Sequence, residues 1–212
     1  MEWLIFVVFA YLAWTVCNIV SKILLTKHIK NIFLYGIVIG FVGLLPLLLI
    51  PFKGLTLPSF QLLLITLAAG ALYIFGMLPY FKALSLEEVS RVIPLWRFKP
   101  LFVLLLAFLF IGERLSSYEI IAFFLLLFGG FFISIRKIKD SFTISRAFYF
   151  MLLSSVLLAV YAILVKYIYL HQAYYDGFIL LKFGSFLGAF SLLFFKRYRV
   201  MLKTTFFQLA IK

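Results

Sequence analysis

The sequence predicts an all-α, polytopic membrane protein, and both its composition and its long apolar runs point to this class. Of the 212 residues, 66% are hydrophobic and only 13% are charged, whereas soluble domains carry about 25% charged residues. About 20 apolar residues in a helix cross the hydrocarbon core of a bilayer. The apolar runs are too long for the short alternating strands of an outer-membrane barrel, so the spans are predicted to be helices.

Seven apolar segments, separated by short polar or turn-forming stretches, are predicted to span the membrane. They cover residues 3–21, 32–52, 59–81, 92–111, 117–135, 147–169 and 175–195. Because the connections are short, neighbouring helices should pack antiparallel as a bundle. No small-residue cleavage site follows the first segment, so we expect it to stay in the membrane. Residues 200–212 are too short to cross again, and they form either a helix on the headgroups or the opening of a further span.

The net charge of +13 is explained by basic loops that orient a membrane protein, because lysine and arginine gather on the cytoplasmic side. The odd-numbered connections are the basic ones, which places the N-terminus outside, and nucleic-acid binding is not expected. The single cysteine, Cys17, excludes an intrachain disulfide and a cysteine-rich metal site. The two histidines lie in different loops and no catalytic motif is present, so we expect no enzyme activity, metal site or cofactor.

The first two segments match the sixth and seventh at an offset of 144 residues, which predicts an internal repeat. This offset pairs Gly40 with Gly184, and an offset of 148 pairs the glycines better. Gly36 and Gly40, like Gly184 and Gly188, are four residues apart, a spacing that lets two membrane helices approach closely. We therefore expect these four glycines at helix-packing contacts. With five spans in the first unit, the second unit would cross the membrane in the opposite orientation, as an inverted repeat.

Four short motifs carry a resemblance to a known family. They are Ala13-Trp14-Thr15 with Asn18, Tyr80-Phe81-Lys82-Ala83-Leu84, Ser90-Arg91-Val92-Ile93-Pro94-Leu95 and Gly112-Glu113-Arg114-Leu115. In this order and at these spacings they resemble EamA-type members of the drug/metabolite transporter superfamily. The resemblance implies ten helices in two five-helix units that export or exchange small metabolites.

On this resemblance, residues 1–136 would be a complete first EamA-like unit. Residues 137–212 would be a partial second unit that has two helices and a short tail and lacks the last three helices. The resemblance also implies an N-terminus inside the cell, the opposite of what the basic loops indicate. Both orientations remain open.

Two cations, Arg97 and Lys99, lie within the fourth predicted span. At about 1.5 Å of rise per residue, Lys99 comes close to the bilayer midplane. All seven acidic residues lie at span ends or in loops, so none can pair with these cations inside the membrane. Either cation can face a water-filled cavity and attract an anionic group, or it can reach the interface or backbone carbonyls instead. Residues two apart do not share a helix face, so we expect at most one to point squarely into a cavity.

Four other residues are candidates for the same substrate cavity. Trp14 and Asn18 lie four apart, on one face of the first helix. An indole and an amide there suit substrate binding, and packing against another helix explains them equally well. Tyr80 allows the same two interpretations, and Lys182 is a further cation inside the seventh span.

Three prolines within or near the predicted spans, Pro79, Pro94 and Pro100, are expected to kink helices and to serve as hinges for alternating access. The predicted function is an EamA-type transporter that moves a small metabolite, with an anionic one favoured, as a multi-pass protein of the cell membrane. The alternative is a non-transporting subunit or truncated remnant that packs with a partner membrane protein. The expected partners are a small-molecule substrate, the lipid bilayer and a second copy or different chain that supplies missing helices.

Overall fold

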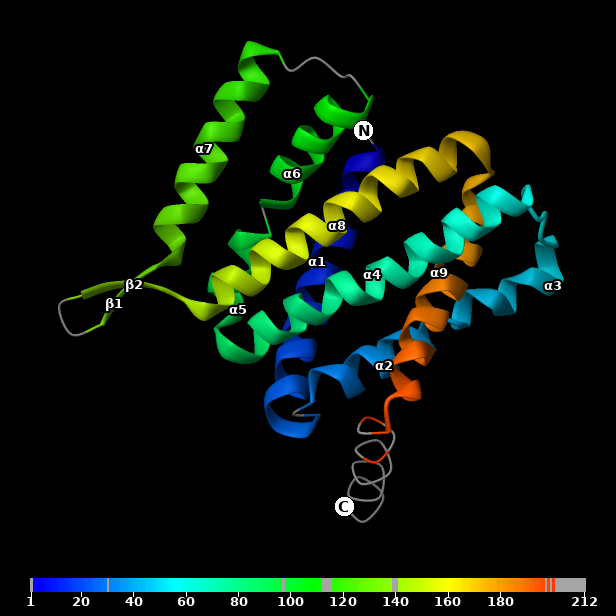
Figure 1. The fold of residues 1–212 in the computed structure, drawn as a ribbon, viewed down its shortest axis with the longest axis horizontal. Helices are drawn as coiled ribbons and strands as arrows, with labels where there is room; N and C mark the ends of the chain where they lie inside the picture. Colours follow the sequence, from blue (N-terminus) through cyan, green and yellow to red (C-terminus); the bar gives the residue numbers. More distant parts are fainter. Residues whose placement is uncertain are drawn as a thin grey trace.

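The protein is helical over most of its described length (Figure 1). The computed structural model describes residues 2–29, 31–96, 98–111, 116–138 and 141–196, together with 198 and 200. Six helical segments in these ranges are long and apolar enough to cross a membrane: Leu4–His28, Ile32–Lys53, Phe60–Leu86, Val89–Leu109, Arg146–His171 and Tyr174–Phe194. The prediction of a polytopic all-α membrane protein is therefore confirmed.

The elements follow the predicted spans in order, with short irregular helical turns at several of their ends. Their bounds are α1 (Glu2–Ile23) with a π-helical turn (Leu24–His28), α2 (Ile32–Val42), a 3₁₀ turn (Leu45–Leu49) with α3 (Ile50–Lys53), α4 (Phe60–Leu86), α5 (Val89–Leu95), α6 (Phe98–Leu106) with a π-helical turn (Ala107–Ile111), α7 (Ser117–Ser134), β1 (Ile135–Ile138), β2 (Ser141–Ile144), α8 (Arg146–His171), α9 (Tyr174–Ser191) and a final 3₁₀ turn (Leu192–Phe194).

Four of the helices begin after a polar residue whose side chain accepts a hydrogen bond from the first turn. Asn31 does this for α2, Ser59 for α4, Ser116 for α7 and Ser145 for α8. These side chains satisfy backbone N–H groups that have no partner within the helix. The polar residues between the apolar runs therefore set where these helices start.

Helix α4 is the centre of the bundle, and both α8 and α9 pack along it (Figure 1). Where α4 meets α9, glycines bring the two backbones together. A Cβ atom added to Gly184 would lie 2.5 Å from the carbonyl oxygen of Leu67, and one added to Gly188 would lie 2.7 Å from the Cα of Ala71. No side chain fits at either position, so the close crossing depends on glycine.

Gly36 and Gly40 lie on the face of α2 that meets α4 and α9. A Cβ added to Gly36 would lie 2.7 Å from Cδ2 of Leu78, and one added to Gly40 would overlap the Cβ of Ala189. All four glycines named from their spacing thus lie at contacts with a second helix. At Gly36 the neighbour is the end of a flexible Leu78 side chain, whereas Gly40, Gly184 and Gly188 leave no room for a side chain. Helices α2 and α9, which the predicted repeat relates to each other, contact each other here.

The fourth span is broken between Pro94 and Pro100, so that α5 ends at Leu95 and α6 begins at Phe98. Proline at position 100 has no N–H to donate, and its ring crowds the carbonyl four residues earlier, which belongs to Trp96. That carbonyl accepts a hydrogen bond of 3.0 Å from the backbone N–H of Lys99 instead. Pro79, in contrast, lies within α4, whose helical conformation continues through it.

Helix α7 stands apart from α4, α8 and α9 in Figure 1, and its main neighbours are α5 and α6. After it comes a two-stranded antiparallel ribbon, β1 and β2, in which Ile135 pairs with Ile144. From the sequence this stretch is expected only to be a basic connection, because four-residue strands leave little periodicity to detect. The Gly112-Glu113-Arg114-Leu115 motif and residues 201–212 lie outside the described residues.

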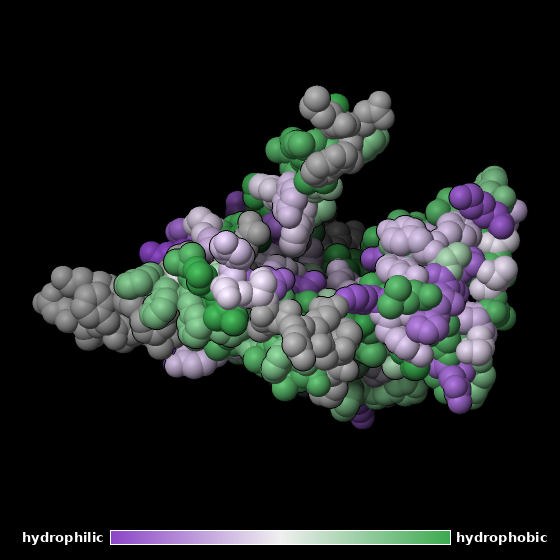
Figure 2. All heavy atoms as spheres, turned by 90° about the horizontal axis from the view of Figure 1, so that it is seen from above, coloured by the Kyte–Doolittle hydropathy of each residue, from purple (hydrophilic) through white to green (hydrophobic). Residues whose placement is uncertain are grey.

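Much of the visible surface carries hydrophobic side chains, whereas hydrophilic ones gather toward the right-hand end of Figure 2. The α3–α4 and α8–α9 connections lie at that end in Figure 1. On α1, Phe6 is 73% exposed and Phe9 is 66% exposed. Apolar surface on this scale suits contact with lipid or with another membrane helix, and not with water.

At the end where α4 finishes, a lysine from α1 binds the last carbonyl groups of that helix. The ammonium of Lys22 donates hydrogen bonds of 2.6 Å to the carbonyl of Leu84 and 2.7 Å to that of Glu87. The side chain of Glu87, which is buried, accepts a 2.7 Å hydrogen bond from Ser145 at the start of α8. This network joins α1, α4 and α8 at one end of the bundle, and the lysine charge complements the dipole of α4.

We expect Lys22→Met to destabilise the protein by about 1.5–3 kcal/mol, because two carbonyls lose hydrogen bonds from a charged donor. The measurement is the thermal unfolding midpoint of the purified protein in detergent. Lys27→Met is the matched control, because Lys27 is exposed and its ammonium makes no hydrogen bond to another described residue. Equal midpoints for the two variants would show that Lys22 only lies near α4 without stabilising it.

Candidate functional site

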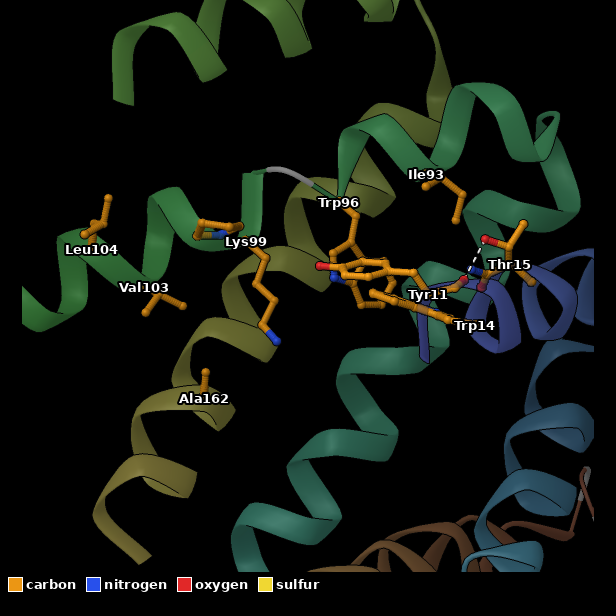
Figure 3. A pocket seen from close by; sticks show the side chains of 11 residues that line it. Tyr11, Trp14, Thr15, Ile93, Trp96, Lys99, Val103, Leu104 and Ala162 are labelled. Carbon is orange, nitrogen blue, oxygen red and sulfur yellow. Dashed lines mark hydrogen bonds between the residues drawn. The ribbon is translucent and has the colours of Figure 1, made fainter. Parts of the chain in front are cut away.

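A cavity of about 670 Å³ lies between α1, the broken fourth span and α8 (Figure 3). Its volume falls within the range of small-molecule sites, about 300–1,000 Å³. The described lining residues are Tyr11, Trp14, Thr15, Asn18, Ile93, Trp96, Lys99, Pro100, Val103, Leu104 and Ala162. A second cavity of about 300 Å³, beside α9, is lined by Leu, Ile and Phe alone within the described part of the chain. The first cavity is therefore the candidate site.

Helix α1 supplies one wall of the cavity through a single face. Tyr11, Trp14, Thr15 and Asn18 follow one another at spacings of three, one and three residues, which places them on the same stripe of a helix. The hydroxyl of Thr15 donates a 2.8 Å hydrogen bond to the carbonyl of Tyr11. The Thr15 hydroxyl therefore points back along its own helix. The aromatic rings beside it form most of this wall.

Trp96, at the end of α5, is the centre of an aromatic cluster. Its ring packs edge-on against Trp14 at 5.6 Å and against Tyr80 of α4 at 4.4 Å. The Tyr80 hydroxyl, which is buried, donates a 2.5 Å hydrogen bond to Oδ1 of Asn18. Edge-to-face packing and this bond join α1, α4 and α5, so the aromatic wall is held in place from behind.

Lys99 is the cation of the cavity. It lies one turn beyond the break in the fourth span, and its side chain is partly buried. In Figure 3 the side chain reaches toward α8 near Ala162, while the rings of Trp96, Tyr11 and Trp14 lie beside one another. The ammonium makes no hydrogen bond or ion pair to any other described residue. No acidic side chain is among the described lining residues.

The structure places the residues expected at the site as follows. Lys99, Trp14 and Asn18 line the cavity, and Tyr80 lies directly behind its wall. Arg97 lies outside the described residues.

Lys182 is not among the residues lining the cavity. Its ammonium lies 5.5 Å from the ring centres of both Tyr73 and Phe178, at the contact of α4 and α9. Two ring faces attract the charge there.

Tyr11, Thr15 and Ala162 line the cavity without having been predicted from the sequence. The first two could have been found, because they share the helical stripe of Trp14 and Asn18. Ala162 carries no chemical signal, and it joins the site only because α8 packs beside α6. No group of three His, Cys, Asp or Glu side chains that could hold a metal ion occurs in the described ranges.

Comparison with known protein families bears directly on this site. The profile of the EamA-like transporter family matches residues 1–135, well over half of the chain. The chain belongs to this family. The matched part of this EamA-like protein contains every described lining residue of the cavity except Ala162. Searches of curated proteins and of solved structures returned no significant match. The protein is a multi-pass membrane transporter of the drug/metabolite type, from a family of transporters and not of enzymes.

The bond between Tyr80 and Asn18 gives a testable prediction about how the wall is held. In Tyr80→Phe the buried Oδ1 of Asn18 loses its donor, and we expect the protein to be destabilised by about 1–3 kcal/mol. Thermal unfolding in detergent measures this loss. Tyr118→Phe, at a position 85% exposed on α7, is the control and should unfold like the wild type. A Tyr80→Phe protein as stable as the wild type would contradict the assigned bond.

Proposed function

We propose that this EamA-like protein carries a small metabolite across the cell membrane through the cavity between α1, α5, α6 and α8, with an anionic substrate favoured. The observation that carries the proposal is the ammonium of Lys99, which faces this cavity and has no partner among the described residues. A lysine at the centre of a membrane helix costs about 2.5–3.5 kcal/mol on insertion scales. A substrate anion, together with water in the cavity, would offset this cost.

Movement by alternating access is part of the proposal. Discontinuous membrane helices are a common feature of transporters, whose sites lie where such helices break. The fourth span breaks between Pro94 and Pro100, and both Trp96 and Lys99 lie at this break. A change of angle between α5 and α6 would move the aromatic wall relative to the cation. Such a change of angle would open the cavity first to one side of the membrane and then to the other.

Reconstitution tests the proposal directly. The 212-residue chain is inserted into liposomes loaded with a mixture of small carboxylates, phosphates, amines and sugars, and the compounds that leave are measured by mass spectrometry. We expect selective release of anionic compounds, compared with liposomes that hold heat-denatured protein. Release at the control rate for all compounds would count against transport by this chain alone.

The alternative function is that of a membrane subunit that works only with a second copy or a different chain. The observation that favours it is the exposed apolar surface of α1, a helix that lines the cavity on its other side. Lipid can cover this surface, and so can another helix. Flux that is absent for the chain alone but appears when a partner membrane protein is added would support this alternative.

A further inference from the structure

The charges around the cavity restrict the kind of anion that it can hold. Lys99 is the one charged side chain among the described lining residues, and the remaining polar ones are Tyr11, Thr15 and Asn18, with the indole N–H groups of the tryptophans. A ligand with one negative charge would match this set. A ligand that also carried an ammonium group would find no carboxylate to receive it.

The acceptors near the aromatic wall are neutral. Oδ1 of Asn18 already accepts the Tyr80 hydroxyl at 2.5 Å, and the hydroxyl oxygens of Tyr11 and Thr15 carry no negative charge that could pair with an ammonium. The ring faces attract a cation, but that attraction is smaller than the loss of hydration when an ammonium is buried. Repulsion from Lys99 adds to this loss. The cavity therefore disfavours zwitterions and cations.

The aromatic wall restricts the body of the ligand in a different way. Tyr11, Trp14 and Trp96 are arranged as successive neighbours, with ring centres 6.2 Å and 5.6 Å apart. Tyr80 supports Trp96 from behind at 4.4 Å. These rings favour a ligand with a flat ring of its own, because aromatic pairs gain more than the burial of their area alone.

The cation and the rings line the same cavity at different places. Trp96 and Lys99 both belong to the broken fourth span. The Lys99 side chain reaches toward α8 near Ala162, whereas the rings of Tyr11, Trp14 and Trp96 lie beside one another (Figure 3). A ligand that contacts both would thus carry its negative group at one end and its ring at the other.

We propose that the cavity binds a monocarboxylate with a planar apolar ring and no ammonium group, its carboxylate at Lys99 and its ring against Trp14 and Trp96. This inference rests on the proposed function, because it names the substrate class of the same site. The arylacetates and arylpyruvates are compounds of this class.

Three indole compounds that differ in charge test the proposal. Indole-3-acetate is an anion, tryptophan is a zwitterion and tryptamine is a cation. Binding of each to the full chain in lipid nanodiscs is measured by isothermal titration calorimetry. We expect indole-3-acetate to bind at least about tenfold more tightly than either of the others, the size of effect expected for one hydrogen bond to a charged group. Hexanoate, a carboxylate without a ring, should bind about fivefold more weakly than indole-3-acetate.

Variants test whether the preference comes from the named residues. In Lys99→Gln the preference for indole-3-acetate over tryptophan should disappear, and in Lys99→Arg it should remain, because the charge is kept. Lys182→Gln is the matched control, since this lysine lies in another span and lies against Tyr73 and Phe178. Trp14→Leu should weaken the binding of indole-3-acetate about fivefold and leave the binding of hexanoate nearly unchanged.

The proposal is overturned if tryptophan or tryptamine binds as tightly as indole-3-acetate, if no probe binds the wild type, or if Lys99→Gln keeps the preference. These comparisons include the wild type and a charge-preserving variant, so they remain decisive if Lys99→Gln does not fold. The proposed function is judged separately by the liposome flux. If another class of anion is released in a Lys99-dependent way, the transport proposal stands. The proposal that the ligand is a ring-bearing monocarboxylate is then wrong.

Discussion

Replacing Lys99 with glutamine is expected to lower the rate of anion release from liposomes by about tenfold to a hundredfold. Lys99 supplies the one positive charge among the described lining residues of the cavity, and a hydrogen bond from a charged group contributes about 1.5–3 kcal/mol. Glutamine is only one atom shorter than lysine and keeps an N–H donor, so the main change is the loss of the charge. The measurement is the initial rate of release at matched amounts of reconstituted protein.

Two controls separate this role from a general effect of intramembrane lysines. Lys99→Arg keeps the charge and should retain most of the rate. Lys182→Gln should also retain it, because the Lys182 ammonium lies over the rings of Tyr73 and Phe178 and away from the cavity lining. If Lys99→Gln inserts normally in the membrane and the rate of anion release is unchanged, Lys99 has no role in transport.

The second large effect is expected for Gly184→Val, which should prevent the bundle from packing. The added Cβ would lie 2.5 Å from the carbonyl oxygen and 2.8 Å from the Cα of Leu67 in α4. Both are backbone atoms of the central helix, so no side-chain rotation can relieve the overlap. Overpacking costs about 1–3 kcal/mol even where side chains can move, and we expect at least the upper end of this range. The yield of monodisperse protein after detergent extraction and its thermal unfolding midpoint measure the loss.

Gly129→Val is the matched control for this experiment. Gly129 lies in α7, and a Cβ added there meets no atom within 4 Å. The same substitution should therefore leave yield and unfolding close to those of the wild type. If both glycine variants extract and unfold alike, the crossing of α4 and α9 is not as tight as described.

Part of the site could be predicted from helix periodicity alone. Trp14 and Asn18 are four residues apart, and residues at that spacing share a helix face whatever the neighbouring helix is. The structure places both in the cavity wall. Tyr11 and Thr15 follow from the same periodicity, once that face of α1 is known to line the cavity. Lys99 stood out because charge inside a membrane segment is costly and calls for a reason.

The partners of these residues could not be predicted in the same way. Tyr80 and Trp96 come from different helices, and their 4.4 Å contact depends on how α4 and α5 pack. Lys182 and Lys99 look alike as lysines within apolar segments, yet one lies over aromatic rings and the other faces a cavity. The environment of a side chain depends on which helix face meets which neighbour, and short-range sequence patterns do not contain that information.

The sequence by itself determined the class of protein, the positions of six of the seven predicted membrane helices and the family resemblance; the predicted span 117–135 is not among the six spans found in the described residues. These depend on the length and apolar character of each segment and on the order of local motifs, and neither requires knowledge of neighbouring helices. Only the tertiary structure decided that Lys22 binds the end of α4 and that a cation and an aromatic wall share one cavity. Each of these depends on contacts between segments far apart in the chain. Such contacts exist only after the helices have packed against one another.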